Sequence, residues 1–162
     1  MKNHPDLAEF NALFPAVREL QVLAARHGIA DIFQDNGGKL LQVLLMLGLT
    51  IVDGREGNDA RDERGREYEV KTVNANLVQC FSTHHHLNPV ILEKYRTVDW
   101  VFGVYRGIEL ERIYIMPPVG LEIYFSKWEK KWHDKGGRDI NNPKIALGHV
   151  VRNGTVLYDA RF

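Results

Sequence analysis

The stretch that decides the fold runs from residue 58 to residue 73 and reads NDARDERGREYEVKTV. Its second half, Glu67 to Val73, alternates between side chains for two faces in the way that a β-strand does. The polar group from Asp62 to Gly65 is typical of a tight turn. The stretch therefore predicts a β-hairpin, in which a short strand beginning at Asp59 pairs with the strand over residues 67–73.

Three side chains of this hairpin are candidates for one chemical centre. Residues two apart on a strand share a face, so Glu69 and Lys71 project together, and the partner strand can bring Asp59 beside them. Two carboxylates suit Mg²⁺, which prefers oxygen ligands and keeps several waters that can attack a phosphate. A nearby lysine would orient that water or stabilise negative charge on the phosphate. We therefore take Asp59, Glu69 and Lys71 as candidate catalytic residues.

The spacing of these residues is suggestive only. A Glu-x-Lys pair on a strand is common by chance, and it most often marks a solvated strand face. Glu56 lies three residues before Asp59 and could serve as an auxiliary carboxylate or as a ligand of a second metal ion.

Periodicity outside the hairpin predicts one α/β domain over residues 1–162. A helical subregion occupies about residues 1–48 and is either core or half of a dimer interface, and the rest of the domain follows over about residues 49–162. Pro15 is expected to kink or divide the first helix. The predicted elements are helices over residues 5–26, 39–47, 90–95 and 121–132, and strands over residues 99–105, 110–116 and 155–158.

The composition is that of a globular protein, with 44% hydrophobic and 26% charged residues. No apolar run approaches the roughly 20 residues that a membrane-spanning helix needs. The N-terminus lacks the apolar core of a secretory signal. Cys80 is the single cysteine, so no intrachain disulfide can form, and we expect it to fill core space in a protein of the reducing cytoplasm.

The charges balance overall, with 21 basic and 21 acidic side chains, which argues against a loose electrostatic binder of nucleic acid. Their distribution is uneven, however. Residues 1–59 hold 5 basic and 8 acidic side chains, whereas residues 126–162 hold 8 basic and 4 acidic ones. A neutral total therefore does not exclude a polyanionic partner for one face of the molecule.

Two polar segments have side chains that can read DNA bases. Ser82, Thr83 and the histidines at 84–86 form one, and Asn141, Asn142 and Lys144 lie in the other. Imidazole, hydroxyl and amide groups can bond to base edges in the major groove, and an asparagine amide can both donate to and accept from adenine. The simpler interpretations are exposed loop histidines and an asparagine turn.

These motifs, taken together, closely resemble the PvuII family of restriction endonucleases, within the PD-(D/E)xK nuclease superfamily. The resemblance runs in order along nearly the whole chain. It rests on DIFQDNGGKLLQ at 31–42, GREGNDA at 54–60, FSTHHH at 81–86, KYR at 94–96, YRGI at 105–108 and DINNPKI at 139–145. One departure lies in the catalytic strand, where the family's Glu-Leu-Lys is Glu69-Val70-Lys71.

The resemblance implies a central mixed β-sheet flanked by helices, with residues 1–48 as a dimerisation region. It implies a homodimer in the bacterial cytoplasm that clamps palindromic duplex DNA and cuts CAGCTG at its centre to leave blunt ends. Asp59 and Glu69 would bind Mg²⁺, with Lys71 as the catalytic lysine, Glu56 as an auxiliary carboxylate and no small-molecule cofactor. The DNA contacts implied are Asp35 along the minor groove, and Ser82, His84, His85, His86, Tyr95, Asn141, Asn142 and Lys144.

Three alternatives differ in what they require. A repair or junction nuclease would share the Asp59, Glu69 and Lys71 centre but would not need the histidine and asparagine readers. A DNA-binding module without cleavage would not need all three catalytic residue types. A histidine-rich metal carrier would bind zinc tightly in the absence of DNA.

Overall fold

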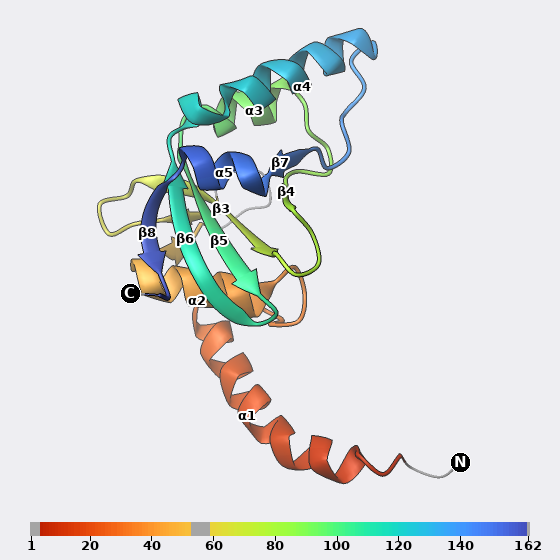
Figure 1. The fold of residues 1–162 in the computed structure, drawn as a ribbon, viewed down its shortest axis with the longest axis vertical. Helices are drawn as coiled ribbons and strands as arrows, with labels where there is room; N and C mark the ends of the chain where they lie inside the picture. The colour runs from red at the N-terminus through yellow and green to blue at the C-terminus, as the bar shows by residue number, and fades with distance from the viewer. Residues whose placement is uncertain (1–3, 53–58, 162) are drawn as a thin grey trace.

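The computed structural model describes residues 4–52 and 59–161 and contains helices on both faces of a central sheet (Figure 1). In chain order the elements are α1 (Leu7–Arg26), α2 (Gly37–Leu47), β1 (Thr50–Ile51), β2 (Ala60–Arg61), β3 (Glu67–Asn74), β4 (Cys80–Ser82), α3 (Pro89–Tyr95), β5 (Asp99–Arg106), β6 (Glu109–Met116), the 3₁₀ helix η1 (Pro118–Leu121), α4 (Glu122–Asp134), β7 (Lys144–Ala146), α5 (Leu147–Asn153) and β8 (Thr155–Asp159).

The central sheet is mixed, as expected. Its six strands lie in the order β1-β2-β3-β5-β6-β8. β3 and β5 run parallel, and every other pair of neighbours is antiparallel. Parallel neighbours need a crossover connection, and here the connection from β3 to β5 contains β4 and α3. This crossover brings α3 to the strand that carries Glu69 and Lys71.

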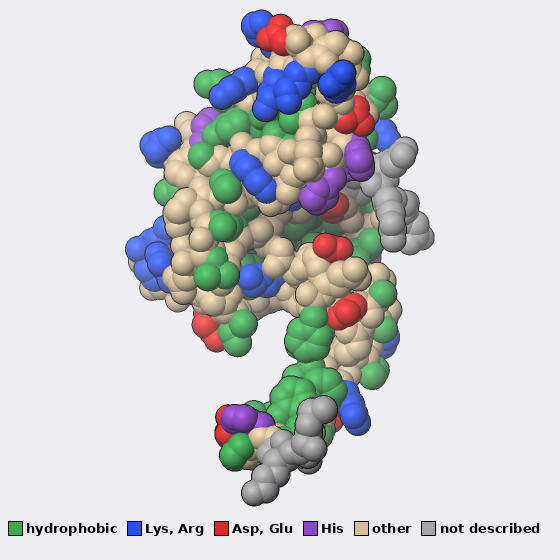
Figure 2. Space-filling model, turned by 90° about the vertical axis from the view of Figure 1, so that its right-hand side faces the viewer, with side chains coloured by type: hydrophobic (Ala, Val, Ile, Leu, Met, Phe, Trp, Pro, Cys, Tyr) green, Lys and Arg blue, Asp and Glu red, His purple; other side chains and the backbone are tan. Residues whose placement is uncertain are grey.

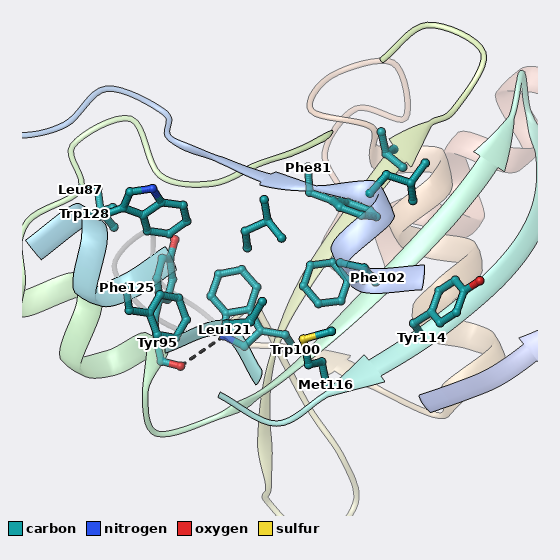
Figure 3. Packing of buried hydrophobic residues seen from close by; sticks show 14 of the residues in the cluster. Phe81, Leu87, Tyr95, Trp100, Phe102, Tyr114, Met116, Leu121, Phe125 and Trp128 are labelled. Atoms are coloured by element: carbon teal, nitrogen blue, oxygen red, sulfur yellow. Dashed lines mark hydrogen bonds between the residues drawn. The ribbon is translucent and has the colours of Figure 1, made fainter. Parts of the chain in front are cut away.

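Alternate side chains of β5 enter two separate cores. Trp100 and Phe102 pack in a cluster with residues of α3, α4 and α5, and Figure 3 shows Trp100 beside Tyr95 and Phe125 and Phe102 beside Phe81. Val101 and Tyr105 belong to the second cluster, which α2 covers. This two-residue period is what a strand buried on both faces requires. The predicted strands over residues 99–105 and 110–116 are confirmed and pair antiparallel.

Gly103 allows α2 to approach the sheet closely. A Cβ atom at this position would lie 3.0 Å from Cγ2 of Val43 and 3.3 Å from Cγ2 of Thr72. A side chain here would therefore push the helix away from β3 and β5. The close packing of α2 fixes the sheet that holds the candidate site.

The N-terminal helix α1 extends away from the body of the molecule (Figure 1). Ala24 is its one buried residue, whereas Phe10 and Leu13 are 55% and 64% exposed. The expected division at Pro15 is wrong, because the helix is continuous from Leu7 to Arg26 with Pro15 inside it. Proline removes a single N–H donor from a helix interior, and the 20-residue helix tolerates that loss.

Five short elements of the described residues did not show in the sequence pattern: β1, β4, η1, β7 and α5. β4 and β7 form a second, two-stranded antiparallel sheet, in which Phe81 pairs with Ile145. Cys80 lies half-buried at the start of β4, so its role as core filler is only partial. No helix in the described ranges is both long and apolar enough to cross a membrane.

Candidate active site

The predicted hairpin is present and brings the second carboxylate to the catalytic strand. Ala60 of β2 pairs with Tyr68 of β3. The turn between them is held by Asp62, whose Oδ1 accepts two backbone N–H groups of the turn. Asp59 lies immediately before β2, and its Oδ2 accepts the N–H of Val70 at 2.9 Å. This backbone contact fixes Asp59 beside the residues on either side of Val70.

Lys71 lies between the two carboxylates. Its Nζ is 2.5 Å from Oε1 of Glu69 and 3.0 Å from Oδ2 of Asp59. The side chain of Val70 is buried in the opposite cluster, under α2. Asp59, Glu69 and Lys71 therefore form one group on one face of the hairpin, as the two-residue period predicted.

Glu69 is the one buried charged or polar residue in the described part of the chain, with 2% of its surface exposed. Burial raises its pKa to about 7, and the negative charge of Asp59 adds to the rise while Lys71 opposes it. Its second oxygen, Oε2, has no hydrogen-bond partner among the described residues. A buried acceptor without a partner lowers the stability of the fold. A cation bound to Oε2 would supply the missing partner and stabilise the charged form of Glu69.

Lys71 stays positively charged in this site. Burial alone would lower its pKa, but the charges of Glu69 and Asp59 outweigh burial and raise it above the usual value. The contact that raises the pKa of Lys71 opposes the rise that burial causes in the pKa of Glu69. The group therefore combines Lys71, which stays positively charged, with Glu69, whose charged form is disfavoured by burial.

A small pocket opens onto this group from the side of α3. Two residues of the histidine segment and three of α3 reach it, among them Tyr95, which was expected to contact DNA. Tyr95 is 4% exposed, and the charge of Glu69 adds to the burial that raises the pKa of its hydroxyl. The lining consists of Asp59, Glu69, Lys71, Thr83, His84, Ile91, Lys94 and Tyr95.

Of this lining, Ile91 and Lys94 were not singled out from the sequence as site residues, and Thr83 was named only as a member of the histidine segment. Lys94 and Tyr95 belong to the KYR motif of the resemblance, which was the one signal that marked them. They reach the pocket because Asn88 caps α3 by accepting the N–H of Ile91, which fixes where the helix starts.

The donor set of the pocket fits a magnesium ion better than a zinc ion. Asp59 and Glu69 offer carboxylate oxygens, and Oε2 of Glu69 is free among the described residues. Hard oxygen ligands and retained waters are what Mg²⁺ selects. Residues 4–52 and 59–161 contain no group of three His, Cys, Asp or Glu side chains that could hold a metal ion. The described residues therefore give no support to the alternative of a zinc carrier. Glu56 lies outside the described residues.

The two predicted base-reading segments are brought together by the small sheet. Asn142 accepts the N–H of Thr83 through Oδ1 at 3.0 Å and donates its own N–H to the carbonyl of His84 at 2.9 Å. Its backbone is left-handed, with φ of 44°. Nδ1 of His85 lies 3.0 Å from Oδ1 of Asn141. The histidine and asparagine segments thus form one surface.

The histidines occupy different environments. His84 is half-buried and lines the pocket of Asp59, Glu69 and Lys71, and burial is the main reason why its pKa is lowered. His85 and His86 are exposed. Figure 2 shows histidine side chains above a hollow in the surface, with acidic side chains in and below it. The expected readers therefore face outward from the rim of the site.

The other predicted DNA contacts divide into two places. Ser82 and Lys144 are exposed opposite each other on β4 and β7, and Nζ of Lys144 donates to Oγ of Ser82 at 2.8 Å. Asp35 is exposed in the turn before α2, with φ of 48°, and is not part of the pocket lining. Asp35 therefore lies in a different segment from Ser82 and Lys144.

The mixed sheet and the carboxylate–carboxylate–lysine pocket on its hairpin define the class of the protein as a nuclease with a restriction-endonuclease-like fold. Residues 5–158 match the family described as restriction endonuclease PvuII. The chain belongs to this family, whose activity is that of a type II site-specific deoxyribonuclease. Enzymes of this family bind DNA, generally use a divalent metal ion and are typically dimers.

Proposed function

We propose that the protein is a magnesium-dependent restriction endonuclease that cuts both strands of CAGCTG at the centre and leaves blunt ends. The observation that carries this proposal is the buried Glu69, which has one oxygen against Lys71 and the other without a partner in the described residues. A group this costly to the fold is typical of a functional site. Asp59 completes the ligand pair from the adjoining strand.

In this proposal Asp59 and Glu69 hold the ion, and Lys71 acts on the phosphate. A bound Mg²⁺ would polarise a phosphate oxygen and lower the pKa of a water ligand. Lys71 keeps its charge beside both carboxylates and stabilises the negative charge that develops on the phosphate. The water oxygen forms a new bond to phosphorus while the bond to the leaving sugar oxygen breaks.

The proposed target rests on the family and on the chemistry of the readers. CAGCTG presents guanine and adenine edges in the major groove, and imidazole and amide groups can bond to such edges. His85 and Asn141 are joined by a contact of 3.0 Å, so each side chain orients the other. Ser82, His86, Asn142 and Lys144 surround this pair in the same two segments.

A homodimer is proposed because a palindrome presents two equivalent half-sites. The exposed side chains of α1 support it: Phe10 and Leu13 stand on a helix with one buried residue. Monomeric proteins rarely expose contiguous apolar surfaces of this kind. We further propose that the enzyme works in the bacterial cytoplasm, where foreign DNA is met.

Cleavage of plasmid DNA with Mg²⁺, followed by sequencing of the ends, tests the proposal. Blunt ends within CAGCTG support it, and ends scattered over other sequences or confined to DNA junctions would instead support a repair nuclease. Lys71→Ala is expected to keep DNA binding and to lose at least about 100-fold in cleavage rate. Lys130→Ala, an exposed lysine on α4, is the matched control and should cut normally. Full activity in Lys71→Ala would refute the assigned centre.

A further inference from the structure

Two of the three acidic side chains of α4 bond to Arg96, and the third, Asp134, is paired with Lys130. Glu122 and Glu129 both bond to Nη2 of Arg96, at 2.9 and 2.8 Å, so the acidic flank of α4 faces α3. Lys127 and Lys131 are four residues apart, which places them on the same side of the helix. Lys135, directly after the helix, continues this spacing, so the basic flank is separate from the acidic one.

The basic flank is exposed and unpaired. Lys127, Lys131 and Lys135 are all exposed, as is Arg138 three residues further on. Within the described ranges none of the four forms an ion pair, whereas Lys130 is paired with Asp134 at 2.9 Å. Residues 127–138 hold five basic and two acidic side chains in a chain whose charges balance overall. We call Lys127, Lys131, Lys135 and Arg138 the basic strip.

The helix turn before the basic strip contacts the end of β7, the strand that follows the asparagine readers in the chain. Tyr124, one turn before Lys127, accepts the N–H of Ala146 at the end of β7 through its hydroxyl at 3.2 Å. At the other end of the helix, Gly137 donates its N–H to the carbonyl of Trp132 at 3.0 Å, which turns the chain out of the helix axis. Figure 2 shows Lys and Arg side chains gathered at the upper end of the molecule, on the face that also carries histidines and the hollow.

We propose that the basic strip binds backbone phosphates of the duplex outside the recognition sequence. From Lys127 to Lys135 the helical rise is about 12 Å. The phosphates of one DNA strand recur about every 3.4 Å of the duplex axis, so a strip lying along this axis matches the span of roughly three to four phosphates. Flexible lysine side chains suit point contacts with phosphates and carry no base specificity. This inference rests on the proposed placement of the recognition sequence against residues 82–86 and 141–144.

The expected consequence is an affinity that depends on the length of the flanking DNA. Each phosphate contact contributes about 0.9 to the slope of log K against log salt concentration. In Lys131→Gln/Lys135→Gln the slope on a duplex of about 30 bp should fall by about 1.8 per protomer, and the slope on a duplex of about 10 bp should not change. Plasmid cleavage by this variant should keep its sequence preference, because the strip is not in the catalytic pocket.

The control is Arg64→Gln/Lys130→Gln, which also removes two exposed positive charges. Arg64 lies in the turn between β2 and β3, across the molecule from β4 and β7 in Figure 1, and Lys130 already has a carboxylate partner. Binding is measured by fluorescence anisotropy in EDTA, so that no strand is cut, on duplexes with and without CAGCTG. The control should keep the wild-type slope on every duplex.

Three results would overturn the inference: a wild-type slope for Lys131→Gln/Lys135→Gln on the long duplex, an equal fall on the short duplex, or an equal fall in the control. Phosphate contacts are independent of sequence, so the length effect should also appear on duplexes without CAGCTG. Failure of wild-type protein to cut CAGCTG would refute the proposed specificity and leave the length effect to be judged separately.

Discussion

The buried Glu69 makes the stability of the metal-free protein depend on pH. Its pKa rises from 4.5 to about 7, chiefly because burial disfavours the charged form. One pKa unit corresponds to about 1.4 kcal/mol, so the whole rise corresponds to about 3 kcal/mol. Because the pKa of Glu69 is raised on folding, protonated Glu69 contributes this amount to the free energy of unfolding. The contribution is fully present below pH 4.5 and is lost as the pH rises through about 7.

Glu69→Gln removes this dependence, because glutamine is neutral at every pH. We expect the free energy of unfolding of the wild type, minus that of Glu69→Gln, to fall by about 3 kcal/mol between pH 4.5 and pH 8 in EDTA. Urea denaturation at one fixed protein concentration measures it, since a dimer's stability depends on concentration. Glu63→Gln, in the exposed turn of the same hairpin, removes a carboxylate without burial and is the control.

Magnesium should reverse the effect if Glu69 is a ligand. An ion that binds only the folded protein stabilises it by about 2.7 kcal/mol at 100 times its Kd, which is close to the loss caused by ionised Glu69. With Mg²⁺ the wild type should therefore keep its stability above pH 7, and Glu69→Gln should gain much less. A difference that stays flat with pH in EDTA would refute the reasoning about burial, and an equal gain in both proteins would refute the ligand assignment.

Three further changes test other parts of the molecule. Phe10→Asp/Leu13→Asp should convert a dimer to a monomer in sedimentation velocity, and a variant that remains dimeric would show that α1 is not the interface. Asn142→Ala should cut plasmid DNA at least about 10-fold more slowly, because it strains a left-handed residue and leaves a backbone N–H unpaired, while Asn142→Gly restores only the backbone. Hydrogen bonds to Arg96 are the main cause of the lowered pKa of Glu122. In urea titrations, the free energy of unfolding of the wild type should therefore exceed that of Glu122→Gln above pH 4.5, and this difference should be lost below that pH.

The catalytic hairpin could be predicted from sequence because its signals are local. The two-residue period places Glu69 and Lys71 on one face, and the polar turn at residues 62–65 brings Asp59 back to them. What sequence alone left open was the burial. A Glu-x-Lys pair looks like a solvated surface, yet Glu69 is 2% exposed, because α3 crosses over this face between β3 and β5.

The reading surface was harder to predict because it depends on contacts between distant residues. β4 and β7 have three residues each, which is too short for a clear periodic signal. The bond from Thr83 to Asn142 joins residues 59 positions apart. Tyr95 shows a related limit: the resemblance implied that it contacts DNA, but the sequence did not show that its ring packs against Trp100 and Phe125.

The residues proposed to recognise bases lie close to those proposed to cleave the DNA. His84 lines the catalytic pocket, and the next residue, His85, contacts Asn141 on the reading surface. Asn142 donates its N–H to the carbonyl of His84, so both segments are tied to the pocket by the same backbone. In the proposed complex, a wrong base that displaces His85 or Asn141 must also move His84 beside Lys71 and the scissile phosphate. The proposed function therefore couples base recognition to catalysis through two consecutive residues, His84 and His85, and requires no movement of a domain to connect them.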